Sequence, residues 1–185
     1  QDSSSAASDV YKRQAQGWGS KALVVALEAP ASRPMQPTLQ PNLSGMPDDT
    51  LVQIAISKDD MSVGVCPGAF HQKLFDSLPK ERNQLLEIQS DLYGFPRLVA
   101  SHYLQTDPAH DTLSDWSFYR RIDAQADFIV AHGRNDTFTA GWAYQYMTDE
   151  TMLTGMGKWS DNTPVLPIIW HDDPLMRQPT FQDCV

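Results

Sequence analysis

"LVQIAISKDDMSVGVCPGAFHQKLFDSLPKERNQLLEIQ", residues 51–89, places a helical pattern between two short apolar runs. The runs "LVQIAIS" and "NQLLEIQ" have the length and content of strands that are buried on both faces. Between them, Pro67 stands where the first turn of a helix tolerates proline, and apolar residues recur at every fourth position from Phe70 to Leu78. Pro79 ends this pattern. The order strand, helix, strand predicts a βαβ crossover, and therefore an α/β fold with a parallel sheet.

The segments on either side extend this prediction. "KALVVALEAP" (21–30) is an apolar run stopped by proline, and it predicts another buried strand. The next segment (31–50) carries four prolines, which favours a surface crossing or a lid over regular structure. From Met156 onward, proline and turn residues predict a tail lying over the domain.

A helix is expected in the second half of the chain. The residues that set its apolar period of three to four are Leu113, Trp116, Tyr119, Ile122, Ala126 and Ile129. This spacing predicts one helical face directed at the core. The segment "ADFIVAHG" within it could, taken alone, form a strand.

Composition limits the class of protein. The chain has 185 residues, 41% hydrophobic and 20% charged, which suits one domain with a single core. A net charge of -9, with 14 scattered basic residues, disfavours nucleic acid as a partner. No apolar run approaches the roughly 20 residues of a membrane span. Cys66 and Cys184 are too few for a disulfide framework and are expected to be one buried side chain and one tail thiol, which leaves the compartment open.

The first residues are expected to stand outside the fold. "QDSSSAASDVYKRQ" (1–14) has no initiating Met, no apolar periodicity and no signal-peptide core, and it resembles translated adapter sequence. We therefore expect a natural N-terminal part to be missing. The domain is predicted to comprise residues 15–170, followed by a C-terminal tail at 171–185.

Candidate catalytic side chains follow two of the predicted strands. Asp59 and Asp60 come directly after the strand at 51–57, and His102 lies in the loop after the strand at 83–89. The carboxyl ends of parallel strands meet at one edge of a sheet, so these side chains are expected to face the same rim. A carboxylate that orients an imidazole is what nucleophilic hydrolysis requires, because the imidazole takes the proton of the attacking hydroxyl.

The order "KDDMSV", "GAFHQKLFDSLP", "LLEIQ" and "DLYGFPRLVASH" resembles the C-terminal half of an α/β-hydrolase, and the resemblance extends from Gly17 to Val165. It implies Asp60 as the catalytic acid, since the family's acid usually has a small apolar residue three places later and Val63 fits. His102 would be the general base and Asp59 the fallback acid. The implied substrate is a small-molecule ester or acyl compound. No cofactor and no metal are implied, and the oligomeric state stays open.

The family's nucleophile elbow is missing. The motif G-x-S-x-G occurs nowhere in the chain, and Ser20 in "GWGSKA" precedes a strand instead of standing on a strand-to-helix turn. Either the elbow lay upstream, which the adapter-like start favours, or the protein is a noncatalytic binding module of the same fold. In the first case this chain is a truncated fragment of an esterase-like hydrolase and is itself inactive.

Other interpretations use the same residue types. Asp59 and Asp60 suit a turn or a helix cap, and His102 could be an ordinary loop histidine. "VAHGRNDTFT" (130–139) imitates the strand and acid loop, with Asp136 as acid and His171 as the remaining histidine downstream.

A metal-dependent hydrolase is the remaining alternative. His102, Asp107, His110 and Asp111 lie close in sequence, and His171 begins a second group of possible ligands, "HDD". Neither group has an i, i+4 helical pair or a recognised zinc spacing.

Overall fold

A four-stranded sheet is the centre of the fold in a computed structural model of the chain, which describes residues 24–30, 46–47, 49–106, 111–171 and 184. The strands, in their order across the sheet, are β1 (Val24–Glu28), β2 (Leu51–Ser57), β3 (Asn83–Ile88) and β4 (Ile169–His171). The first three are parallel to one another, and β4 is antiparallel to β3. The predicted α/β class is therefore confirmed, and the sheet is parallel as predicted except at β4.

The three predicted strands form where their apolar runs indicated. Every residue of β2 and β3 is buried, as expected for strands covered on both faces. The segment after Met156 was predicted to be a tail lying over the domain, but it also contributes the short strand β4 to the sheet, and Trp170 of β4 lies opposite Leu86 of β3. The three residues of β4 are too few to show an alternating apolar pattern in the sequence. The strand forms because the open edge of β3 provides its hydrogen-bond partners.

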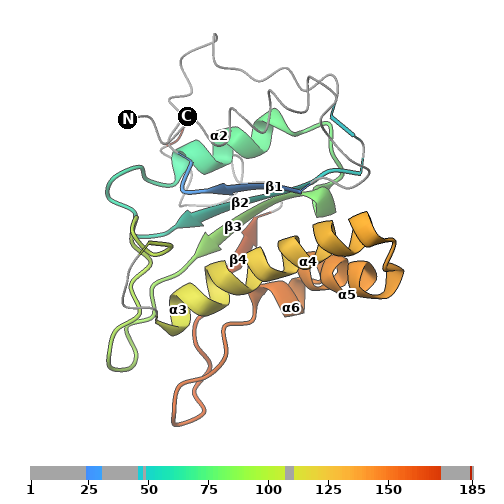
Figure 1. Ribbon diagram of the computed structural model, residues 1–185. Helices are drawn as coiled ribbons and strands as arrows, with labels where there is room; N and C mark the ends of the chain where they lie inside the picture. The colour runs from blue at the N-terminus through green and yellow to red at the C-terminus, as the bar shows by residue number, and fades with distance from the viewer. Residues whose placement is uncertain (1–23, 31–45, 48, 107–110, 172–183, 185) are drawn as a thin grey trace.

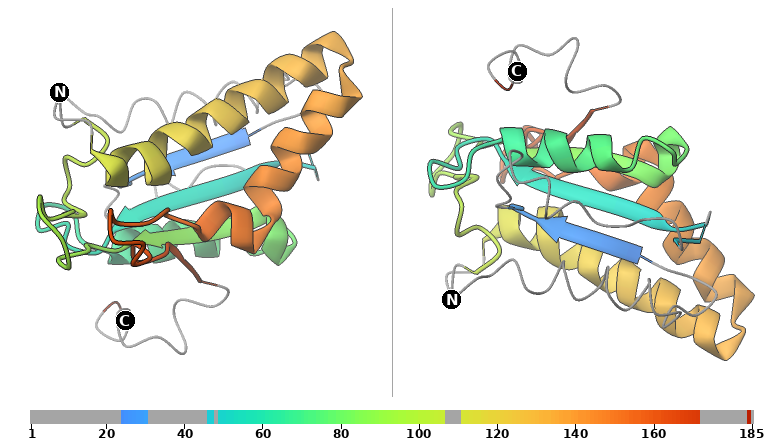
Figure 2. Two further views of the ribbon diagram at one scale, coloured as in Figure 1. Left: turned by 90° about the horizontal axis from the view of Figure 1, so that it is seen from below. Right: turned by 90° about the horizontal axis from the view of Figure 1, so that it is seen from above.

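Helices cover both faces of the sheet (Figures 1 and 2). α2 (Cys66–Leu74) packs against one face, whereas α4 (Arg120–Arg134) and α5 (Thr137–Thr148) pack against the other. The shorter elements are a 3-10 turn (Lys80–Arg82), α3 (Thr112–Ser114), a π-helical turn (Asp115–Tyr119) and α6 (Glu150–Thr154). No helix in the described part of the chain is long and apolar enough to cross a membrane.

α2 has the predicted start, with Pro67 in its first turn, and ends at Leu74, before Pro79. A glycine brings the helix close to the sheet. A Cβ added to Gly68 would lie 2.3 Å from Cγ2 of Ile56, so a larger residue here would push α2 away from β2.

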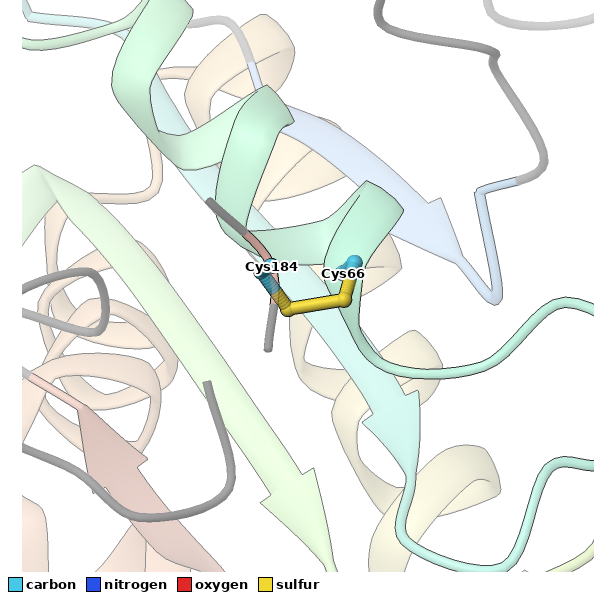
Figure 3. The surroundings of a disulfide bond; sticks show 2 residues. All are labelled: Cys66 and Cys184. Carbon is cyan, nitrogen blue, oxygen red and sulfur yellow. A yellow bond between two sulfur atoms is a disulfide. The ribbon is translucent and has the colours of Figure 1, made fainter. Parts of the chain in front are cut away.

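The expectation of two unpaired cysteines is wrong. Cys66, the first residue of α2, forms a disulfide bond with Cys184, 118 positions further along the chain (Figure 3). Sequence spacing carried no sign of this pairing, because it depends on the fold bringing the two Cα atoms to 5.2 Å.

The helix expected from Leu113 forms, and Leu113 and Trp116 of its predicted inner face pack into the core, but the face predicted for its C-terminal half is wrong. Ala126 and Ile129 are exposed, and the buried positions include Arg121 and Gln125. One cause is the π-helical turn, which adds a residue to a helical turn and rotates the following residues. The other cause is that Arg121 and Gln125 have polar partners on the sheet, which the hydropathy pattern of the helix does not predict.

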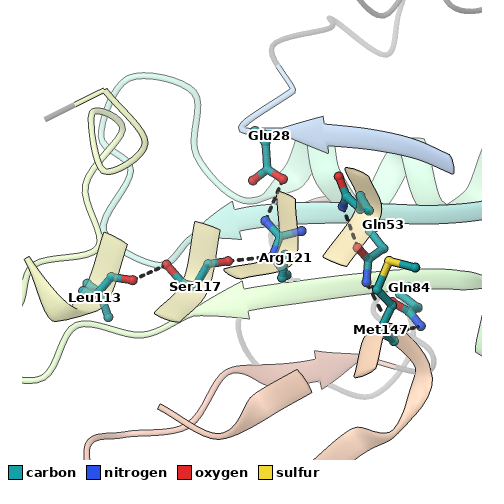
Figure 4. A network of polar contacts seen from close by, with 8 residues as sticks. Glu28, Gln53, Gln84, Leu113, Ser117, Arg121 and Met147 are labelled. Carbon is teal, nitrogen blue, oxygen red and sulfur yellow. Dashed lines mark hydrogen bonds and ion pairs between the residues drawn. The ribbon is translucent and has the colours of Figure 1, made fainter. Parts of the chain in front are cut away.

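These partners form a buried polar layer between α4 and the sheet (Figure 4). Arg121 donates hydrogen bonds to Ser117 O and to Glu28 Oε1, both at 2.6 Å. Gln125 Nε2 donates to Gln53 Oε1, and Gln53 Nε2 donates to Oε1 of Gln84, both at 2.7 Å; Gln84 in turn donates to Met147 O at 3.0 Å. The side chains of this layer are thus hydrogen-bonded to one another and to nearby backbone oxygens, except at Nη1 of Arg121, which has no hydrogen-bond partner among the described residues.

The segment that imitated a strand and acid loop is helical. Residues 130–134 are the last turn of α4, which is capped by Asn135 with a left-handed backbone (φ 57°). Asp136 caps α5, because its side chain accepts a hydrogen bond from Thr139 N at 3.1 Å. The alternative reading of Asp136 as the acid of a βα loop is therefore excluded.

Several predictions fall outside the described residues. They are the adapter-like segment 1–14, Ser20, the proline-rich segment 31–45, the possible metal ligands Asp107 and His110, and the tail at 172–183.

Candidate functional site

The loops that follow β2 and β3 meet beyond the carboxyl ends of these strands, where Figure 1 shows them together. Lys58 N donates a hydrogen bond to Ile88 O at 2.9 Å, which continues the pairing of the two strands. Asp59 N then donates to Ala100 O at 3.1 Å. The chain after β3 therefore returns to the rim of the sheet, and this return brings His102 to the loop after β2.

Asp60 and His102 are joined by a hydrogen bond. His102 Nδ1 lies 2.9 Å from Asp60 Oδ2, and the exposed fractions of the two side chains are 30% and 1%, respectively. An ionised carboxylate only accepts hydrogen bonds, so Nδ1 carries the proton and the neutral ring keeps a lone pair on Nε2. A half-buried imidazole held in this tautomer can accept a proton at Nε2.

Asp60 is held in its ionised form. Its Oδ1 accepts hydrogen bonds from the backbone N–H groups of Ser62 and Val63, both at 2.8 Å. Burial alone would raise the pKa of Asp60, but the hydrogen bonds from Val63, His102 and Ser62 outweigh it and lower the pKa below its ordinary value. The carboxylate is therefore charged at neutral pH and suited to orient an imidazole and to stabilise its protonated form.

The adjacent carboxylate has a different partner. Asp59 is exposed, and its Oδ2 accepts a hydrogen bond from the hydroxyl of Ser90. Of the two candidate acids, the structure thus brings Asp60 to His102 and Asp59 to Ser90. Ser90 was not identified from the sequence, although its place two residues after β3 on the same rim was an available signal.

A buried aspartate anchors the loop that carries His102. Asp91 accepts hydrogen bonds from Tyr93 N (2.9 Å), Trp159 Nε1 (3.1 Å) and Leu166 N (3.0 Å). Burial would raise the pKa of Asp91, but these donors lower it. Asp91 also pairs through its backbone with Leu98, so both ends of the segment 91–98 are fixed. Asp91 was not predicted as a site residue, because its partners Trp159 and Leu166 come from a distant segment.

The same loop packs closely on a tryptophan. A Cβ added to Gly94 would lie 2.3 Å from the Trp159 ring, so glycine is needed for this approach. Tyr93 contacts the same ring and donates a hydrogen bond to Asp161 Oδ2 at 2.8 Å. Together with the Asp91 contacts, this packing ties the loop after β3 to residues 157–166.

Large apolar side chains are exposed directly after each member of the pair. Met61, which follows Asp60, is 95% exposed, and Tyr103, which follows His102, is 63% exposed. The Tyr103 and His102 rings meet edge to face, with centroids 5.2 Å apart. Phe95, in the loop that Asp91 anchors, is 96% exposed. The pair therefore lies on loops with apolar side chains available for contact.

The candidate metal ligands that the structure describes are not assembled into a metal site. In the described ranges, no three His, Cys, Asp or Glu side chains are placed to hold a metal ion. His171 is buried in β4, and its Nε2 lies 2.8 Å from Oε2 of Glu87 on β3, with both side chains 1% exposed. Asp111 caps α3 by accepting a hydrogen bond from Ser114 N at 2.8 Å.

Comparison of the chain with protein-family models, with curated proteins and with solved structures finds no match. An ionised, buried carboxylate bonded to a half-exposed imidazole can take a proton from a hydroxyl or a water molecule and return it to a leaving group.

Proposed function

We propose that this chain supplies the acid and the histidine of a Ser-Asp-His triad in an α/β-hydrolase that cleaves carboxylic esters or related acyl bonds. The observation that carries the proposal is the hydrogen bond of 2.9 Å between Asp60 and His102 at the carboxyl ends of two neighbouring parallel strands. His102 Nε2 would take the proton of the serine hydroxyl and pass it to the leaving group. Asp60 would hold the tautomer and stabilise the imidazolium that forms.

The nucleophile of this proposal lies outside these 185 residues, because the sequence contains no G-x-S-x-G motif. The serine would come from a preceding segment of the same protein, where the α/β-hydrolase order of serine, acid and histidine places it. The described chain then contributes the general base and the residue that orients it.

The surroundings of the pair favour an acyl substrate. Met61 and Tyr103 expose apolar surface beside Asp60 and His102. Apolar side chains with a few polar groups among them are typical of pockets for small organic ligands. An acyl chain or an aromatic alcohol would gain binding free energy by covering this surface.

The missing motif favours a second candidate function. A noncatalytic binding module would keep the α/β architecture and the exposed apolar loops without needing a serine. The sequence upstream of Gly17 separates the two candidates, since only the hydrolase requires a nucleophile elbow there.

The test is to express the chain together with its upstream coding sequence and to measure the hydrolysis of p-nitrophenyl esters. We expect a G-x-S-x-G motif upstream. We also expect His102→Ala to lower kcat by roughly 10⁶-fold, because the base is lost, and Asp60→Asn to lower it by roughly 10⁴-fold through the wrong tautomer. His132→Ala, which removes an exposed histidine of α4, is the matched control and should leave kcat unchanged.

Two results would contradict the proposal. A longer chain without an elbow would favour the binding module, and full activity of His102→Ala would show that His102 is not the general base. The 185-residue chain alone is expected to be inactive on these esters. Turnover by this chain that His102→Ala abolishes would show that the nucleophile lies within it.

A further inference from the structure

We propose that Ser90 and Asp59 form a clamp that positions His102 against Asp60. This inference deepens the proposed function, on which it rests, because it assigns positioning residues to the same site. Ser90 Oγ donates its hydrogen bond to Asp59 Oδ2 and accepts one from Ala100 N at 2.8 Å. Asp59 N donates to Ala100 O at 3.1 Å, so the clamp joins three segments of chain.

The clamp lies next to both Asp60 and His102 in sequence. Asp59 directly precedes Asp60, and Ala100 stands two residues before His102. The clamp holds both backbone polar groups of Ala100, whose side chain is fully buried in the core cluster beneath the site. The relative placement of the two loops at the rim therefore depends on contacts made by residues adjacent to the pair on both sides.

Asp91 and the clamp have separate tasks. Asp91 fixes the segment 91–98 to itself and to residues 157–166. The clamp fixes the following segment, from Ala100, to the loop after β2. The clamp is the attachment that adjoins both Asp60 and His102 in sequence, so its loss should change the distance between Asp60 Oδ2 and His102 Nδ1.

A hydroxyl suits the position of Ser90, because it donates one hydrogen bond and accepts another through the same oxygen. Ser90→Ala would leave Ala100 N–H and Asp59 Oδ2 without their partner. Ser90→Thr keeps the hydroxyl and should keep the clamp. A Ser90 that only closed a local turn would leave the contact between Asp60 and His102 unchanged when replaced.

The pKa of Asp60 reports on this contact, because His102 is one of the donors that lower it. The experiment follows the carboxyl carbon of Asp60 by ¹³C NMR in the 185-residue chain as a function of pH. His102→Ala should raise the pKa of Asp60. Ser90→Ala changes no charge and should move the pKa in the same direction by part of that rise, and Ser90→Thr should restore it.

The double variant separates positioning from a general loss of structure. With His102 already replaced by Ala, Ser90→Ala should not change the pKa of Asp60 further, because the contact that it loosens is gone. Ser62→Ala is the matched control: its side chain is exposed, and the backbone N–H that Asp60 accepts from is kept. It should leave the pKa unchanged.

The proposal is overturned if Ser90→Ala leaves the pKa of Asp60 at the wild-type value, or if it raises it equally with and without His102. Amide hydrogen exchange of Ala100 in the unaltered chain gives a test that needs no variant. The clamp predicts slow exchange there, and exchange as fast as that of an open loop would overturn it. Neither measurement requires a nucleophile. If the upstream sequence had no nucleophile elbow, the proposed function would be wrong, but these two results would not change.

Discussion

Asp60 is the residue at which burial and hydrogen bonding compete most directly. Burial raises its pKa, and the donors Val63, His102 and Ser62 together lower it further than burial raises it. A carboxyl group whose pKa is lower in the folded state than its ordinary value of 3.8 stabilises the fold at pH values above 3.8. This contribution is lost as the pH falls through the folded-state pKa.

Replacing Asp60 should therefore make the free energy of unfolding less dependent on pH in the acid range. We expect the free energy of unfolding of Asp60→Asn to depend less on pH than that of the wild type as the pH falls from about 5 towards the folded-state pKa. Urea denaturation at a series of pH values measures this dependence. Asp76→Asn, an exposed substitution after α2, serves as the control, and equal slopes for wild type and Asp60→Asn would contradict the prediction.

For single residues, the strand that each one follows in sequence predicted its place in the structure. Asp60 and His102 could be placed on one rim because each follows a strand whose apolar run is readable, and the structure brings the two together. Their catalytic roles stay a prediction. Ser90 and Asp91 were missed, since polar loop residues have no period and their partners lie far along the chain.

At the scale of elements, α4 shows how polar residues can form the inner face of a helix. Arg121 and Gln125 are buried against Glu28 and Gln53 of the sheet. Burial raises the pKa of Glu28 above its ordinary value, and the nearby guanidinium of Arg121 offsets only part of this rise. An apolar period predicted the helix but not its inner face, because hydropathy cannot report that polar side chains on opposing elements will pair.

Interrupting the hydrogen bonds that join the side-chain amides of Gln125, Gln53 and Gln84 should lower the free energy of unfolding. Gln125→Leu removes the donor to Gln53 Oε1, which would remain buried without this partner, so we expect a loss of about 1–3 kcal/mol in the free energy of unfolding. Asp127→Leu places the same residue on the exposed face of α4 and should change stability by less than about 0.5 kcal/mol. Chemical denaturation of both variants tests this, and a Gln125→Leu protein as stable as the wild type would show that the layer does not need its amides.

At the scale of the whole molecule, the disulfide ties the end of the chain to the first residue of α2 (Figure 3). Cross-links stabilise by restricting the unfolded chain, and the effect grows slowly with the length of the closed loop. Disulfides also persist only where conditions are oxidising. The separation of 118 residues makes this bond a constraint on most of the described fold.

We expect reduction of the bond to lower the free energy of unfolding by about 4–5 kcal/mol, the chain-entropy estimate for a loop of this length. Denaturation with and without reductant measures the loss. A variant with Cys66→Ser and Cys184→Ser should be insensitive to reductant. Alkylation of both thiols in the native, unreduced protein would show that the bond is absent.

The local chain was sufficient for the parallel strands, for α2 and for the existence of α4, because strand burial and helical periodicity are short-range properties of neighbouring residues. Tertiary packing alone decided the strand β4, the polar inner face of α4 and the disulfide bond. It also decided which of two adjacent aspartates meets His102. These features depend on partners brought together from distant segments, and a residue's own neighbours in sequence carry no record of such partners.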